Sequence, residues 1–433
     1  MRKVAFTLSI IFLVELILGG PGFWSIGGGF SVRKYLFVSS FVLLSIYSVK
    51  SGYWCFRFID AVVFMFLTLS VAIWMFFMPL IRGQSIGMAF ADGSALFLLL
   101  LYFPLSQLIR KGMINWERVK RLFILLVVTV SFFQLLVWLL VAYNNELAGP
   151  VRYAFIYLFH SIGSSSEGLD IYVGYMPDGF YRVMWITSIY FLPAFCFLYV
   201  KPNKMMNDYF FLAILVAGIF VSYTRALWLG IAAWFVLFFV GKSLIVHYKE
   251  IGRLRFDRVS CLIFSILIGV ILLIWWGGQR LFVERIYFTS AGDQGMSIRL
   301  YQIKSLLEAW SNHPVFGQGF GSHADYIRAE SAPFSYEMVG FALLMKLGVV
   351  GILLWIVSTG LVLLYAFQVA WRWGRYRWFL WWMSTSIVFS AVSFTNPYLL
   401  NFIGMSIVLS LALEIDWEDR KNNDKMYGVH CNI

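Results

Sequence analysis

The sequence predicts an all-α polytopic membrane protein with about twelve transmembrane helices and one large outer loop that contains short helices. Three observations lead to this fold class. Of the 433 residues, 61% are hydrophobic and only 13% are charged. Apolar runs of about 20 residues, the length that crosses a hydrocarbon core of about 30 Å, recur along the whole chain. The basic residues lie mainly in short segments between these runs.

The apolar runs set the order of the expected helices. We expect helices over residues 4–20, 34–49, 58–80, 87–109, 122–143, 181–200, 207–221, 226–246, 259–277, 338–366, 378–394 and 398–414. The first run, "MRKVAFTLSIIFLVELILGG", lacks a convincing small-residue cleavage site, so we expect it to stay as the first helix. The chain then divides into 1–143 (helices 1–5), 144–180 (an outer loop), 181–277 (helices 6–9), 278–337 (the large outer loop), 338–414 (helices 10–12) and 415–433 (a tail).

The charge distribution predicts the orientation. The formal net charge is +12, and most of the 34 Lys and Arg residues fall on the segments that alternate to one side of the predicted helices. The positive-inside rule therefore places both termini in the cytoplasm, and the same placement argues against nucleic-acid binding. The four cysteines (Cys55, Cys196, Cys261 and Cys431) show no CxxC spacing, so neither disulfides nor a zinc site is suggested.

The stretch "SYTRAL", residues 222–227, contains an arginine between two apolar runs that are predicted to span the membrane. In this topology Arg225 ends a tight turn on the outer face. Deep in lipid an arginine would cost about 2.5–3.5 kcal/mol. Two interpretations are open at this point: an interfacial arginine that snorkels to the headgroups, or a cation held for function.

The large outer loop contains a predicted amphipathic helix from Ser297 to Trp310. Ser297 is its expected N-cap, and the segment 312–314 ends it. Arg299 then lies in the first turn, where a cation opposes the helix macrodipole. Such local conflicts are more frequent at functional sites; the alternative is a solvated helix face.

Three glycines at alternate positions follow, in "PVFGQGFGSH". Gly317, Gly319 and Gly321 lack the context of a nucleotide-binding loop, and they indicate a tight turn or a close backbone approach. Glu337 lies at the outer mouth of the next helix, and Lys346 lies deeper in it. A lysine in an apolar run is expected to have a partner or to face a cavity.

The outer face thus gathers Arg225, Arg299 and Glu337, with Arg280, Arg285 and His323 nearby in the sequence. The planar fork of arginine binds phosphate oxygens through two N–H groups. A carboxylate can take a proton from an attacking hydroxyl.

Four stretches, in this order and spacing, resemble the bacterial O-antigen ligase and O-antigen/exopolysaccharide polymerase superfamily: "SYTRALWLG", "SIRLYQIKSLLEAWSNHPVFGQGFG", "LLMKLGVVGILLW" and "SFTNPYL". The similarity covers roughly residues 205–413. It implies a bacterial inner-membrane enzyme with a periplasmic active site and an undecaprenyl-pyrophosphate-linked glycan as donor.

The resemblance also implies roles for single residues. Arg225 and Arg299 correspond to the arginines that hold the pyrophosphate, with Arg280 and Arg285 as weaker candidates. Ligases of this superfamily have a His-Asn pair where the helix with the Leu-x-x-x-Gly-x-x-Gly pattern begins. This chain has Tyr336-Glu337 in roughly that place. The departure favours a polymerase, with Glu337 as the catalytic base and His323 as second choice.

The expected reaction is the polymerisation of lipid-linked repeat units of O-antigen, capsule or exopolysaccharide, with inversion at the anomeric centre. The lipid pyrophosphate is already a good leaving group, so no general acid is needed. No cofactor is implied. No metal is implied either, because the first outer segment, "PGFWSIGGGFSVRK", has no acid and the outer loops contain no DxD. The expected partners are the donor, a glycan acceptor and membrane lipid, with a chain-length regulator as a further candidate.

Two other functions stay open at this point. A ligase would move finished glycan onto lipid A core or another acceptor. A transporter or flippase would carry out no chemistry, but it predicts internal repeats with matching broken helices. The chain instead has one large outer loop with arginines at the surface.

Five further titratable residues have weaker interpretations. We expect interior polar pairing, rather than catalysis, for Glu15, Asp60 and Asp92. His160 and Asp170, in a tyrosine-rich loop, could contact acceptor sugar, or their loop could lie on the membrane surface.

Overall fold

The computed structural model describes residues 2–19, 31–52, 54–151, 154, 171–175, 181–249, 294–327, 330, 332–394, 396 and 398–427. The first half of the chain contains α1 (Arg2–Leu18), α2 (Val32–Lys50), α3 (Phe58–Leu69), the π-helix η1 (Ser70–Phe77), α4 (Met78–Ile81), α5 (Ile86–Gly93), η2 (Ser94–Leu101), α6 (Tyr102–Arg110), α7 (Trp116–Tyr143) and η3 (Asn145–Leu147). The second half contains β1 (Ile171–Tyr175), β2 (Tyr181–Trp185), η4 (Ile186–Tyr190), α9 (Phe191–Val200), α10 (Met206–Val221), α11 (Arg225–Lys249), α14 (Gln294–Ser311), α15 (Val339–Trp373), α16 (Tyr376–Phe394) and α17 (Phe402–Tyr427).

The fold is that of a multi-pass membrane protein. Six helical stretches among the described residues are long and apolar enough to cross a membrane: Val32–Lys50, Phe58–Ile81, Ile86–Arg110, Trp116–Tyr143, Arg225–Ser243 and Val339–Trp373. Three shorter apolar helices are Phe6–Leu18, Ile186–Val200 and Met206–Val221. The count of twelve spans stays a prediction, and the expected helix over 259–277 lies outside the described residues.

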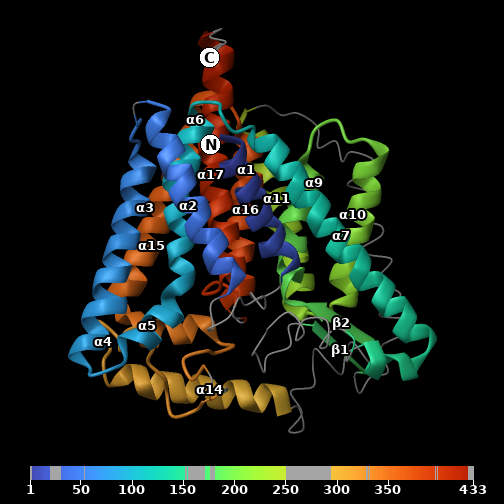
Figure 1. Ribbon diagram of the computed structural model, residues 1–433. Coiled ribbons are helices and arrows are strands. Elements are labelled where there is room, and N and C mark those ends of the chain that lie inside the picture. The colour runs from blue at the N-terminus through green and yellow to red at the C-terminus, as the bar shows by residue number, and fades with distance from the viewer. Residues whose placement is uncertain are drawn as a thin grey trace.

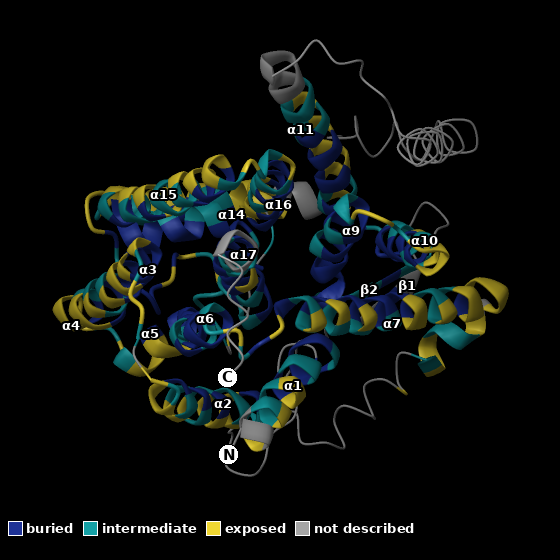
Figure 2. Ribbon diagram, turned by 90° about the horizontal axis from the view of Figure 1, so that it is seen from above, coloured by how far each residue is buried: buried dark blue, intermediate teal, exposed yellow. Residues whose placement is uncertain are grey.

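Both described chain ends lie at one end of the helix bundle (Figure 1). Helix α14 lies across the opposite end, which it shares with the β1–β2 hairpin; we call this the α14 end. Large apolar side chains such as Phe64, Leu139 and Ile356 are more than half exposed on the bundle, as a surface that faces lipid requires. Figure 2 shows exposed residues along the outward sides of α2, α3, α7 and α15.

Several helices begin where a polar side chain caps them. The side chains of Ser31, Ser85 and Asn115 accept hydrogen bonds from the backbone of the first turns of α2, α5 and α7. The long helix α15 ends at Gly374, which has the left-handed conformation that glycine adopts without a Cβ clash.

The hairpin differs from the all-α expectation. Strands β1 and β2 pair antiparallel, with Val173 opposite Val183. Residues 181–185 were expected to begin a helix, but the helical segment starts only at Ile186. Their alternation of side chains suits a strand whose inward residue, Val183, packs against Val141 of α7 and Val221 of α10.

Helix α17 packs against α6, η2, α15 and α16 near the centre of the bundle (Figure 2). It extends to Tyr427, so much of the expected tail over 415–433 is a continuation of this helix. Its acidic residues pair with basic residues at the chain-end side of the bundle. The pairs are Asp416 with Arg110, Asp419 with Arg57, Glu414 with Lys120 and Glu418 with Arg375.

Helix α15 is broken at Gly348, whose φ of 62° and ψ of −171° are not helical. The glycine-rich loop fills the break. Gln318 N donates to Met345 O (2.9 Å), Gly319 N donates to Lys346 O (2.8 Å), and Val349 N donates to Pro314 O (2.9 Å). The loop therefore satisfies backbone groups that the break removes from the helix, as a membrane protein requires.

The other side of this loop packs on the π-helix η1. Phe320 N donates to Trp74 O, and Trp74 Nε1 donates to Phe316 O, each at 2.8 Å. The sequence prediction of a tight turn or close backbone approach at the three glycines is confirmed. Their φ angles are positive, and a Cβ on Gly317 would lie 2.4 Å from Lys346 O.

We predict that Gly348→Ala destabilises the protein far more than Gly374→Ala. Both glycines have a φ of +62°, but their ψ angles differ: 26° at Gly374, a left-handed conformation that alanine adopts at a cost of about 1–3 kcal/mol, and −171° at Gly348, in a region that is essentially restricted to glycine. Only at Gly348 would the new Cβ meet backbone, 2.4 Å from Gly317 N and from Val315 O, whereas nothing lies within 4 Å at Gly374. Thermal unfolding of the purified variants in detergent measures the difference, and equal midpoints would contradict this account of the loop.

Candidate active site at the α14 end

Arg299 of α14 and Glu337, just before α15, form an ion pair. Arg299 Nε donates to Glu337 Oε2 at 3.1 Å. The side chains are 47% and 30% exposed, so the pair contributes little to stability and is accessible to a ligand. The structure thus brings together two residues that lie 38 positions apart in the sequence.

Helix α14 is held against the start of α15 by a small core. Leu306 of α14 packs in a buried cluster with Tyr336, Met338 and Ala342, and Met338 N donates to Gln302 Oε1 at 2.9 Å. These contacts fix Arg299 relative to Glu337.

The helix predicted from Ser297 to Trp310 is present as Gln294–Ser311. The assignment of Ser297 as N-cap was wrong, because the helix begins three residues earlier. Arg299 therefore lies in the second turn and not in the first. The conflict with the macrodipole that we expected there is correspondingly small, since this effect falls off within the first turn.

His323 lies two residues after Gly321, at the end of the glycine-rich loop. The imidazole is exposed, and its Nδ1 lies 3.3 Å from Ala324 O. The neighbouring Ala324 N donates to Tyr336 Oη at 2.7 Å, which joins the His323 segment to the Glu337 segment. Burial raises the pKa of Tyr336, so its hydroxyl stays protonated and accepts this bond.

Beneath these segments lies a buried ion pair between Asp92 and Lys346. Lys346 Nζ is 2.7 Å from Asp92 Oδ2 and also donates to Phe334 O at 2.8 Å. Asp92 Oδ2 accepts from Gly321 N at 2.8 Å. The expected partner of Lys346 is therefore found, and one carboxylate ties together α5, α15 and the glycine-rich loop.

The interior pairing expected for the other two intramembrane acids is also present. Glu15 pairs with Arg33 at 2.7 Å, and Asp60 pairs with Arg110 at 2.6 Å. All three acids are buried.

Arg225 lies elsewhere at the α14 end, as the first residue of α11. Leu227 N donates to the carbonyl of Thr224 at 2.9 Å, so α11 begins directly at the turn. The Arg225 side chain is exposed, and within the described residues no hydrogen bond or ion pair joins it to Arg299 or Glu337. A helix N-terminus and an arginine both attract an anion, so this position suits phosphate.

Sequence reasoning missed Arg182, on strand β2. Its Nε donates to Ser222 O at 3.1 Å, which brings a further cation to the turn before Arg225. A signal was present. The stretch "IYVGYMPDGFYRVMW" has two runs of β-branched and aromatic residues around an Asp-Gly pair, which is typical of a β-hairpin.

The remaining candidates cannot be placed. Arg280, Arg285, His160 and Asp170 lie outside the described residues.

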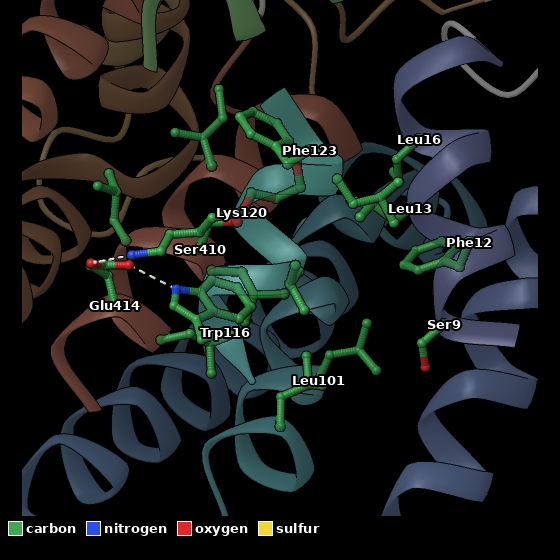
Figure 3. A pocket seen from close by; sticks show the side chains of 18 of the residues that line it. Ser9, Phe12, Leu13, Leu16, Leu101, Trp116, Lys120, Phe123, Ser410 and Glu414 are labelled. Carbon is green, nitrogen blue, oxygen red and sulfur yellow. Dashed lines mark hydrogen bonds and ion pairs between the residues drawn. The ribbon is translucent and has the colours of Figure 1, made fainter. Parts of the chain in front are cut away.

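A cavity of about 240 Å³ is lined by residues of α1, α2, η2, α6, α7, α9, α16 and α17 (Figure 3). Its walls are mainly apolar. Its most polar part is Glu414, which accepts from Trp116 Nε1 at 2.7 Å and from Lys120 Nζ at 3.0 Å. Arg225, Arg299 and Glu337 are not among the residues that line it, so the cavity is not part of the candidate active site.

Comparison with known families finds a match over the middle of the chain. Residues 210–356 match the O-antigen ligase family. The match begins in α10 and ends inside α15, so it takes in Arg225, α14, the glycine-rich loop and the break at Gly348. The resemblance to the O-antigen ligase and polymerase superfamily is thereby confirmed. No curated protein and no solved structure matches the chain.

The match supports an enzyme of the glycosyltransferase type, which acts on a lipid-linked glycan donor and an acceptor. Because the matching family consists of enzymes, the match favours an enzyme over a transporter. The family match does not separate a polymerase from a ligase.

We predict that Lys346→Met destabilises the protein by about 3–5 kcal/mol, because it leaves the Asp92 charge buried and unpaired. The double variant Asp92→Asn/Lys346→Met removes both charges and should regain a large part of this loss. Lys304→Met is the matched control on an exposed pair, with an expected effect below about 1 kcal/mol. Unfolding in detergent gives the three values, and a double variant no better than Lys346→Met would contradict the charge argument.

Proposed function

We propose that the protein polymerises undecaprenyl-pyrophosphate-linked oligosaccharide repeat units of O-antigen, capsule or exopolysaccharide on the periplasmic face of the bacterial inner membrane. The observation that carries this proposal is the exposed Arg299–Glu337 pair inside the segment that matches the O-antigen ligase family. The pair joins a cation suited to pyrophosphate with a carboxylate suited to accept a proton.

In this proposal Arg225 and Arg299 bind the pyrophosphate of the donor. Negative charge grows on the pyrophosphate as the bond to the anomeric carbon breaks, so fixed cations lower the barrier. Arg299 uses its Nε for Glu337 and offers its Nη groups to a phosphate oxygen. Arg225 adds its charge to the N-terminus of α11. A lipid pyrophosphate stabilised in this way leaves without a general acid.

Glu337 is the proposed base. It takes the proton from the acceptor hydroxyl, whose oxygen attacks the anomeric carbon from the side opposite the pyrophosphate. The new glycosidic bond forms as the old bond breaks, and undecaprenyl pyrophosphate leaves. This geometry inverts the anomeric centre. His323 is the second candidate for the base, since the Ala324–Tyr336 contact keeps its segment beside Glu337.

A ligase is the second candidate function. It is favoured by the description of the matching family, which is O-antigen ligase. In that case the same residues bind the same donor, and the acceptor is lipid A core or another glycan carrier. Tyr336-Glu337, in the place of the His-Asn pair that we associate with ligases, favours the polymerase.

The purified protein should convert a synthetic undecaprenyl-pyrophosphate repeat unit into a ladder of longer lipid-linked glycans. We expect the ladder to form in the presence of a chelator, because arginines supply the cations in this proposal. Electrophoresis of the lipid-linked products is the measurement. Transfer only after lipid A core is added would identify a ligase, and intact substrate in both assays would contradict the proposed enzyme.

We predict that Glu337→Gln lowers turnover by about 10²–10⁴-fold, the usual contribution of a general base. Arg225→Ala and Arg299→Ala should both shorten the glycan and reduce its amount in cells, because each removes a pyrophosphate contact. Lys304→Ala is the control, since Lys304 is an exposed cation on the same helix as Arg299. Normal turnover by Glu337→Gln would remove its assignment as base and direct the same test to His323→Ala. Unchanged glycan in both arginine variants would remove the pyrophosphate roles.

A further inference from the structure

The turn that carries Arg225 has a strained backbone. Tyr223 has a φ of 50°, and Asn203 is the other non-glycine residue with a positive φ in the described part of the chain. A bulky residue in this conformation persists only where its surroundings hold it, and such positions are concentrated at functional sites.

Part of what holds the turn is local. Ser222 Oγ donates to Ile219 O at 2.7 Å, and Thr224 Oγ1 donates to Ser222 O at 3.2 Å. The Tyr223 ring packs edge to face on Trp228, with 5.4 Å between the ring centroids. These contacts close the turn, but they do not fix where it lies in the molecule.

The hairpin supplies contacts from outside the turn. Arg182 Nε donates to Ser222 O at 3.1 Å, and Thr224 Oγ1 lies 3.3 Å from Met184 Sδ. Both contacts come from β2 and reach the two residues that flank Tyr223.

The hairpin itself is anchored to the bundle. The fully buried Gln134 of α7 donates through Nε2 to Val183 O at 2.8 Å and to Gly218 O at 3.0 Å. One amide therefore joins β2 to the last turn of α10. The buried cluster of Val141, Val173, Val183 and Val221 packs both strands of the hairpin against α7 and α10.

From these contacts we infer that Arg182 is a positioning residue for Arg225. It holds the Ser222 carbonyl, so that α11 begins where Arg225 can meet the pyrophosphate. An alanine at this position leaves the strained turn with its local contacts and the weaker Thr224–Met184 contact, and Arg225 then samples unproductive positions. This inference rests on the proposed function, in which Arg225 binds pyrophosphate.

A double-mutant cycle tests the inference. Arg182→Ala should lower kcat/KM for the lipid-linked donor by roughly 10–100-fold, through a lower kcat as well as a higher KM, because Arg225 binds the pyrophosphate in the ground state and stabilises the charge that grows on it as the bond breaks. In the Arg225→Ala background the same change should cost less than about 3-fold, since there is no longer an arginine to position. Arg182→Lys keeps a donor and a charge and should recover part of the activity. Arg118→Ala, which removes an exposed arginine at the other end of the bundle, should have no effect.

A second measurement does not depend on the reaction. Hydrogen exchange should become about 10-fold faster in Arg182→Ala at the amides of Leu227 and Trp228, which bond to the Thr224 carbonyl, and should stay unchanged in α14. Unchanged exchange at this turn would overturn the positioning role. Equal losses from Arg182→Ala with and without Arg225 would also overturn it, and would make Arg182 an independent phosphate ligand. Full activity of Arg225→Ala alone would instead reject the proposed pyrophosphate role, while the exchange measurement still decides what Arg182 does.

Discussion

The buried pair of Asp92 and Lys346 is the interaction on which the candidate active site depends. Each charge alone would be strongly unfavourable within a membrane bundle, and together they satisfy each other at 2.7 Å. The carboxylate also holds Gly321 N, and the ammonium also holds Phe334 O. Gly321 lies shortly before His323 in the sequence, and Phe334 lies shortly before Glu337. The pair therefore anchors the proposed base from below.

The break in α15 is the second constraint, and it follows from the same region. A helix that passed straight through Gly348 would leave no room for the glycine-rich loop, and the loop would have no carbonyls to bind. Backbone complementarity between the loop and the broken helix lets irregular chain lie against the bundle without unsatisfied polar groups. The precise fit needs glycine at positions 317 and 348, because backbone from each lies against the other.

The ion pairs of this molecule differ in exposure. Several pairs between helices, such as Glu15–Arg33 and Asp60–Arg110, are buried and hold the bundle together. The Arg299–Glu337 pair is exposed, so a substrate can take over either partner at little cost in stability.

The sequence by itself determined the membrane character, the helix over residues 297–310 and the positions of the charged candidates. These follow from composition and from local periodicity, which do not require the rest of the chain. It also indicated the resemblance to the O-antigen ligase and polymerase superfamily, since the motifs lie in a fixed order, and the family match over residues 210–356 supports it. Only the tertiary structure decided that Lys346 pairs with Asp92, that Glu337 pairs with Arg299, and that Arg182 holds the turn of Arg225. These partners lie between 38 and 254 positions apart, and their pairing depends on how the helices pack. The hairpin was overlooked although its sequence carries a signal, because residues 181–185 continue into an apolar run and were assigned to the helix that follows; in the structure, packing of Val183 with residues of α7 and α10 accompanies the strand pairing.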